Sequence, residues 1–296
     1  MNGEAYLQAQ LDSFKTQTHA NWTLWVSDDG STDQTHAILA RFKSSSPAGQ
    51  VNIVKGPQKG FAANFLSLLA KVAQPADFYA YSDQDDIWLP QKLQLAVQNL
   101  RAWPASQPAL YCTRTELIDA HGKHLGFSRL WPREASFKNA LTQNIAGGNT
   151  MVFNRAAQQL LAEAGSGLEM IAHDWWTYLV VTACGGKVFF DATPTLQYRQ
   201  HANNLIGANH ELTAPLRSVQ RLMAGRFRLW NTQNIAALQK LLHHLPQQNQ
   251  TALHTFAKAR TAPFFARLYG VYQSGVYRQT LSGNLGLIAA TLLKRI

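Results

Sequence analysis

The first hundred residues alternate between short apolar runs and amphipathic segments, and this alternation limits the fold more than any other feature of the sequence. Extended runs are expected at residues 21–27, 51–54 and 78–82, and helical spacing of apolar residues at 4–14, 34–43, 65–72 and 91–102. Strands that alternate with helices in this way are typical of an α/β domain, in which crossover helices connect the strands of a largely parallel sheet.

Aspartates follow two of the expected strands directly. Asp28 and Asp29 come after residues 21–27, and Asp83, Asp85 and Asp86 come after residues 78–82. Open α/β sheets bind their ligands at the carboxyl ends of the strands. Carboxylate oxygens are hard ligands that suit Mg²⁺ or Mn²⁺, which usually keep some water and pair with substrate phosphates. A plainer interpretation is that the second cluster is an exposed acidic turn before the helix that Pro90 opens.

Three further segments have the composition of ligand-binding loops or helix starts. Gly30 favours a tight turn after Asp29, and Ser31 or Thr32 is expected to cap the next helix. Gly147 and Gly148 are typical of a loop whose backbone approaches a ligand closely. Asp174 stands at the start of an apolar helix, where it either caps the helix or carries out chemistry.

Composition and charge narrow the class of protein. A chain of 296 residues with 46% hydrophobic and 15% charged residues can fold as one large domain or two ordinary ones. Its formal net charge of +10 predicts attraction to an anionic partner, such as nucleic acid, a sugar nucleotide or an acidic membrane face. Cys112 and Cys184 are expected to be reduced and buried, in a cytoplasmic protein. The sequence has no apolar run of the roughly 20 residues that would span a bilayer.

The sequence changes character near residue 212, from alternating elements to helices without strands, and it becomes rich in Lys and Arg. Apolar residues at helical spacing beside these cations suit a helix that contacts a membrane surface or a partner. An ordinary amphipathic bundle with a solvated basic face would show the same pattern. We therefore expect two parts, residues 1–210 and a helical basic region at 211–296.

Over residues 1–210 the chain resembles glycosyltransferase family 2, whose nucleotide-sugar-binding fold is called GT-A. Four phrases carry the resemblance: SDDGSTD at 27–33, SDQDDIWLPQKL at 82–93, HDWW at 173–176 and YRQHANN at 198–204. The resemblance implies an α/β GT-A domain with a Rossmann-like mixed sheet, followed here by a C-terminal helical extension. It also implies an inverting, metal-dependent transfer of a sugar from a nucleoside diphosphate to a hydroxyl group.

The resemblance assigns roles to particular residues. Asp174 corresponds to the catalytic base, which removes the proton of the acceptor hydroxyl. Contacts to the nucleotide sugar are implied for Asp28, Asp29, Asp83, Lys59 and Arg199. Asp85, Asp86 and His201 are implied to bind a Mg²⁺ or Mn²⁺ ion. Trp175 and Trp176 are implied to form a platform for a sugar ring.

The wording of the motifs looks most like the rhamnosyltransferase branch of the family, which builds bacterial surface polysaccharides such as O-antigen. This implies dTDP-L-rhamnose as donor, a lipid-linked or polysaccharide acceptor, and a place on the inner face of the cytoplasmic membrane. Family members begin with an apolar strand before a Tyr-Asn-Gly-like turn. The present sequence starts at the equivalent of that Asn-Gly, so we expect the first strand of the sheet to be missing.

Two other functions are compatible with parts of the sequence. A truncated, inactive homologue would still bind nucleotide sugar in a metal-dependent manner without turnover. A nucleic-acid-binding module is suggested only by the positive charge, and the concentration of cations in the C-terminal region, away from the acids, is evidence against it.

Overall fold

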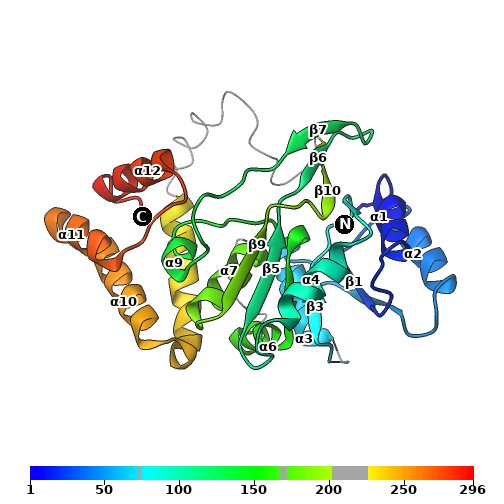
Figure 1. The fold of residues 1–296 in the computed structure, drawn as a ribbon, viewed down its shortest axis with the longest axis horizontal. Helices are drawn as coiled ribbons and strands as arrows, with labels where there is room; N and C mark the ends of the chain where they lie inside the picture. The colour runs from blue at the N-terminus through cyan, green and yellow to red at the C-terminus, as the bar shows by residue number, and fades with distance from the viewer. Residues whose placement is uncertain (73–74, 166, 168–171, 202–225) are drawn as a thin grey trace.

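The computed structural model describes residues 1–72, 75–165, 167, 172–201 and 226–296 (Figure 1). Its strands form a parallel pair and two four-stranded sheets. The pair is β1 (Leu24–Asp28) with β2 (Val51–Lys55). One sheet has the strand order β3 (Phe78–Ala80), β8 (Val152–Asn154), β5 (Ala109–Thr113), β9 (Lys187–Asp191). The other sheet has the strand order β4 (Ile87–Trp88), β10 (Leu196–Arg199), β6 (Glu116–Ile118), β7 (His124–Phe127). β5 runs parallel to β9, whereas β8 is antiparallel to both β3 and β5. The expected mixed α/β architecture is therefore confirmed.

Helices surround the strands, and others form the C-terminal region. The first group is α1 (Leu7–Lys15), α2 (Thr35–Ser44), α3 (Phe61–Lys71), α4 (Lys92–Arg101), α5 (Phe137–Ala140), the 3₁₀ turn η1 (Gly148–Thr150), α6 (Arg155–Ala164) and α7 (His173–Ala183). The second is α9 (Arg226–Leu238), η2 (Gln239–His244), α10 (Gln247–Thr261), α11 (Phe264–Ser274) and α12 (Leu281–Leu292). None of the described helices is both long and apolar enough to cross a bilayer.

The largest hydrophobic cluster joins both parts of the chain. Every residue of α7 is buried, and its side chains share this cluster with α6, β5 and β8. Leu238, Leu253 and Phe256, from the C-terminal helices, belong to the same cluster and are almost fully buried. Each such side chain stabilises the fold by about 1.5–3 kcal/mol relative to an exposed one. The expected boundary near residue 210 lies outside the described residues.

Several local expectations are corrected by the structure. Neither Ser31 nor Thr32 caps α2, because the N-cap is Gln34 and its side chain makes no capping hydrogen bond. The carboxylate of Asp33 accepts the backbone N–H of Thr35 at 3.0 Å, and the hydroxyl of Ser31 donates to Asp28. Gly30 does make the turn, with φ of 103°. The phrase at 82–93 contains an additional strand, β4, which pairs with β10.

The parallel pair and the sheet that contains β3 are separate, and β1 and β3 are the strands that border the gap between them. Among the described residues, β1 pairs only with β2, and β3 pairs only with β8. Residues of both β1 and β3 line one large cavity, together with residues of α1 and α3. The carboxyl ends of these two strands therefore open onto a common space.

Candidate active site

A single cleft of about 2190 Å³ contains most of the side chains that the sequence singled out. Its walls include Asp28, Asp29, Asp83, Asp85, Asp174, Trp175 and His201. These residues come from the end of β1, the loop after β3, the first turn of α7 and the segment after β10. Six of the seven carry carboxylate or imidazole groups, so the cleft is built to contact polar or charged ligands.

The turn after β1 holds its two aspartates in different ways. Asp28 is buried, and its carboxylate accepts the backbone N–H of Ser31 at 3.1 Å and of Gly30 at 3.3 Å. Burial raises the pKa of Asp28, but the hydrogen bonds from Ser31 and Gly30 and the nearby His36 outweigh burial and hold it below its ordinary value. Asp29 accepts the backbone N–H of Gln58 at 2.6 Å. Asp28 therefore orders the turn, and Asp29 connects it to the loop before α3.

Asp85 and His201 meet in the cleft although 116 positions separate them. The Nε2 atom of His201 lies 2.8 Å from Oδ2 of Asp85. The His201 ring also lies 5.0 Å from the ring of Tyr6, centroid to centroid. A carboxylate and an imidazole at this separation offer one hard and one borderline ligand to a divalent cation.

Asp83 and Asp174 both have raised pKa values inside the cleft. Burial, with the charges of Asp85 and Asp174, raises the pKa of Asp83 to about 7. Burial also raises the pKa of Asp174 to about 6, although hydrogen bonds from Trp175, Gly148 and Asn144 oppose this shift. Both carboxylates titrate near neutral pH, which is where a general base works best.

Asp86 lies in the protein interior and not on the cleft wall. It is fully buried; Asn149 donates to its carboxylate at 2.5 Å, and the backbone N–H of Arg199 does so at 3.4 Å. Burial, together with the charges of Asp83 and Asp85, raises the pKa of Asp86 well above its ordinary value. Lys92 is equally buried, and its Nζ donates to the carbonyl oxygen of Thr150. Asp86 thus connects the phrase at 82–93 to the glycine-containing loop.

Asp174 occupies the first turn of α7, where Ala172 and not Asp174 is the N-cap. Its Oδ1 accepts the backbone N–H of Trp175 at 2.6 Å. The preceding residue, His173, stacks on Phe65 with ring centroids 4.0 Å apart. Burial lowers the pKa of His173 to about 3, so the ring is neutral. A Cβ on Gly148 would clash with Nε2 of His173, which explains a glycine at this position.

The remaining candidates divide between the cleft and other places. Trp175 lines the cleft but is only 8% exposed, and its indole N–H donates to the carbonyl oxygen of Ala140 at 2.7 Å. Trp176 is completely buried in the hydrophobic core, so its ring has no surface to offer a sugar. Arg199 is buried and donates to the carbonyl oxygen of Asp85 at 3.1 Å. Lys59 is exposed beside the cleft residues Gln58 and Gly60.

Three residues of the site were not assigned a role from the sequence. Asn64 donates to the carbonyl oxygen of Ser27 at 3.0 Å and so connects α3 to the end of β1. Asn149 donates a hydrogen bond to the carboxylate of Asp86, and the ring of His173 packs against Gly148. Asn149 and His173 stand beside residues that were identified, in the Gly-Gly-Asn and His-Asp phrases. Their partners are distant in sequence, so only the fold shows what they contact.

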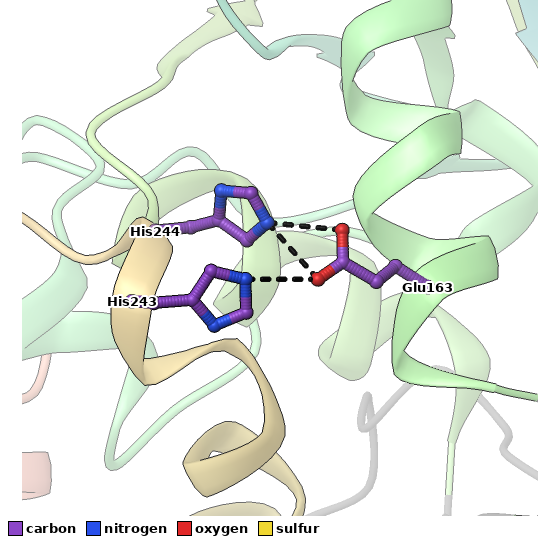
Figure 2. Close-up of side chains that lie close together, drawn as sticks. All are labelled: Glu163, His243 and His244. Atoms are coloured by element: carbon purple, nitrogen blue, oxygen red, sulfur yellow. Dashed lines mark hydrogen bonds and ion pairs between the residues drawn. The ribbon is translucent and has the colours of Figure 1, made fainter.

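Among the described residues, the one group of three ligand atoms close enough to hold an ion lies outside this cleft. Glu163 of α6 contacts His243 and His244 of η2, with Nε2 to carboxylate oxygen distances of 3.1 Å and 2.9 Å (Figure 2). All three side chains are exposed. The cleft aspartates do not form such a compact set by themselves, and an ion there would need ligands from a bound substrate.

Comparison with known proteins places this chain among sugar-transferring enzymes. The profile of the family described as "Glycosyl transferase family 2" matches residues 1–161. The dTDP-rhamnosyl transferase RfbG of Shigella flexneri is 30% identical over 70% of this chain and 73% of its own length. The mannosyltransferase PcManGT of Pyrobaculum calidifontis, solved with GDP-Man and Mn²⁺, has a TM-score of 0.51 at 18% identity. The match covers 97% of this chain and 76% of the PcManGT chain. TarS of S. aureus, solved with UDP-GlcNAc, has a TM-score of 0.53 at 15% identity. The match covers 93% of this chain and 90% of the TarS chain.

Proposed function

Because this chain belongs to glycosyl transferase family 2, we propose that it is an inverting, metal-dependent glycosyltransferase that moves a sugar from a nucleoside diphosphate to an acceptor hydroxyl. The observation that carries this proposal is the meeting of Asp29, Asp85 and Asp174 in one cleft. These carboxylates come from three distant parts of the chain.

The donor nucleotide is proposed to bind at the carboxyl ends of β1 and β3. Asp29 contacts the base or ribose, and Asp28 keeps the turn in shape through its bonds to Gly30 and Ser31. Asp83 contacts the ribose. Lys59 is exposed in the loop after β2 and supplies a positive charge for the diphosphate, whereas Arg199 acts indirectly by holding the backbone of Asp85.

The donor set of the cleft fits a divalent cation. Nε2 of His201 and Oδ2 of Asp85 lie 2.8 Å apart, and these two side chains would hold the ion. A bound Mg²⁺ or Mn²⁺ neutralises the charge that builds on the departing nucleoside diphosphate. Asp86 supports this site from the interior, because Asn149 and the backbone of Arg199 bind its carboxylate.

Asp174 is proposed to accept the proton of the attacking hydroxyl group. Its pKa of about 6 leaves the carboxylate ionised at neutral pH and still basic enough to take a proton. The backbone N–H of Trp175 fixes the orientation of the carboxylate. Attack from the face of the sugar opposite the diphosphate would invert the configuration at the anomeric carbon. The ring of Trp175 is proposed as a platform for a sugar.

The donor is proposed to be dTDP-L-rhamnose, because the named relative RfbG is a dTDP-rhamnosyl transferase. The acceptor is proposed to be a lipid-linked or polysaccharide glycan, used at the inner face of the cytoplasmic membrane. A screen of nucleotide sugars with Mn²⁺, read as protection against thermal unfolding and as donor hydrolysis, tests the donor. We expect dTDP-rhamnose to give the largest effect, and a larger effect from UDP- or GDP-sugars would refute this choice.

A further inference from the structure

The outer surfaces of α11 and α12 carry two apolar stripes. On α11, Phe265, Tyr269 and Tyr272 follow one another at helical spacing and are 81%, 66% and 79% exposed. Leu281, Leu285, Ile288 and Leu292 form the same kind of stripe on α12. Of the fifteen large hydrophobic residues exposed in the described part of the chain, nine lie between residues 264 and 293. An accumulation of this kind marks an interaction surface.

The buried faces of the same helices hold this surface in place. Arg267 is buried on α11, and its Nε donates to the carbonyl oxygen of Thr291 at the end of α12, at 2.7 Å. Val271 and Leu287 belong to the main hydrophobic cluster. Both helices lie at the end of the molecule opposite α1 and α2 (Figure 1). The outward stripes are therefore not needed for packing within this chain.

The charge of this region matches an anionic surface. Residues 226–296 contain nine Lys and Arg and no Asp or Glu, whereas residues 1–225 contain eighteen Lys and Arg against seventeen Asp and Glu. Nearly all of the net charge of +10 therefore lies in the C-terminal helices. Lys294 is exposed directly after the stripe of α12. An exposed cation beside a Leu, Phe and Tyr surface, within a region of net positive charge, is typical of helices that lie in the plane of a membrane.

We propose that the outer stripes of α11 and α12, the docking face, bind the surface of a bilayer that contains anionic phospholipids. α12 has twelve residues and is about 18 Å long, so it lies on the membrane and does not cross it. Leu287 and Ala290, on the inner side of α12, line the cleft that contains Asp174. A glycan attached to a membrane lipid would thus meet the cleft where it reaches the docking face.

Vesicle flotation tests this proposal without donor or acceptor, so its outcome is independent of the proposed transferase activity. We expect the protein to float with vesicles of phosphatidylcholine and phosphatidylglycerol, to float poorly with phosphatidylcholine alone, and to be released by salt. The double variant Leu285→Ser/Ile288→Ser should bind at least about tenfold more weakly. A matched control, Leu125→Ser/Leu130→Ser, removes similarly exposed residues elsewhere and should bind like wild type.

Two results would overturn the proposal. Equal vesicle binding by both double variants would show that the docking face is not the contact. A stable dimer of the wild-type protein that does not float, and that dissociates in the Leu285→Ser/Ile288→Ser variant, would show that a second copy covers this face. Circular dichroism of both variants checks that the helices remain folded.

Discussion

Replacement of Asp174 by Asn should affect catalysis and stability in opposite directions. Asn has nearly the same shape as Asp and can still accept the backbone N–H of Trp175, but it cannot remove a proton. Loss of a general base lowers the rate about 10²–10⁴-fold. We therefore expect sugar transfer by Asp174→Asn to fall by at least two orders of magnitude, while nucleotide binding remains.

The same substitution should increase the free energy of unfolding. The pKa of Asp174 is about 6 in the fold against 3.8 ordinarily, and this difference corresponds to about 3 kcal/mol of destabilisation at neutral pH. Because the folded state holds the proton more tightly, the cost is absent below pH 3.8, grows as the pH rises and is complete above about pH 6. The amide that replaces the carboxyl group never ionises, so the variant avoids this cost. The gain is at most about 3 kcal/mol, because the amide nitrogen is a donor and cannot accept the hydrogen bonds from Gly148 or Asn144.

A transfer assay measures the expected loss of activity, and urea unfolding at two pH values measures the expected gain in stability. We expect Asp174→Asn to be more stable than wild type by up to about 3 kcal/mol at pH 7.5, with roughly half of that gain at pH 5. Asp191→Asn, at the end of β9 and outside the cleft, is the matched control and should retain transfer. Retained transfer by Asp174→Asn would refute the assignment of the base. Lower stability together with lost transfer would indicate a structural role.

Three further predictions concern the cleft and its support. Asp85→Asn should abolish Mn²⁺-dependent binding of nucleoside diphosphate, measured by calorimetry with Asp191→Asn as control; undiminished binding would exclude Asp85 as a ligand. Gly148→Ala should destabilise the fold by about 1–3 kcal/mol in urea unfolding, because its Cβ would clash with the ring of His173, and a neutral effect would show that the loop can shift. Trp175→Phe should lower the free energy of unfolding by about 1–3 kcal/mol in urea unfolding, because the carbonyl oxygen of Ala140 loses its hydrogen-bond donor. An unchanged free energy of unfolding would mean that water replaces the indole N–H.

Regular elements with a clear period were predictable from the sequence. The helix expected at 34–43 is observed at Thr35–Ser44 and the strand expected at 51–54 at Val51–Lys55, because each has a clear apolar pattern between turn residues. β4 was missed because it has only two residues, and its pairing with β10 depends on Leu196, far along the chain. Short strands of this kind are fixed by tertiary contacts and not by local propensity.

The site was predictable as a set of residues but not as a geometry. Asp85 and Asp86 are neighbours and looked equivalent, yet one lines the cleft and the other is buried against Asn149. Trp175 and Trp176 likewise point to the cleft and to the core, because adjacent residues of a helix lie on different faces. No local pattern indicates which member of such a pair meets the ligand.

Anomalous diffraction from crystals grown with Mn²⁺ and dTDP tests the central claim most directly, because it locates the ion and the nucleotide together. The account predicts a Mn²⁺ peak bound by Asp85 and the diphosphate, with Asp29 and Asp174 facing the same ligand in one cleft. A Mn²⁺ peak found only at Glu163, His243 and His244, or a nucleotide bound away from Asp85, would contradict it.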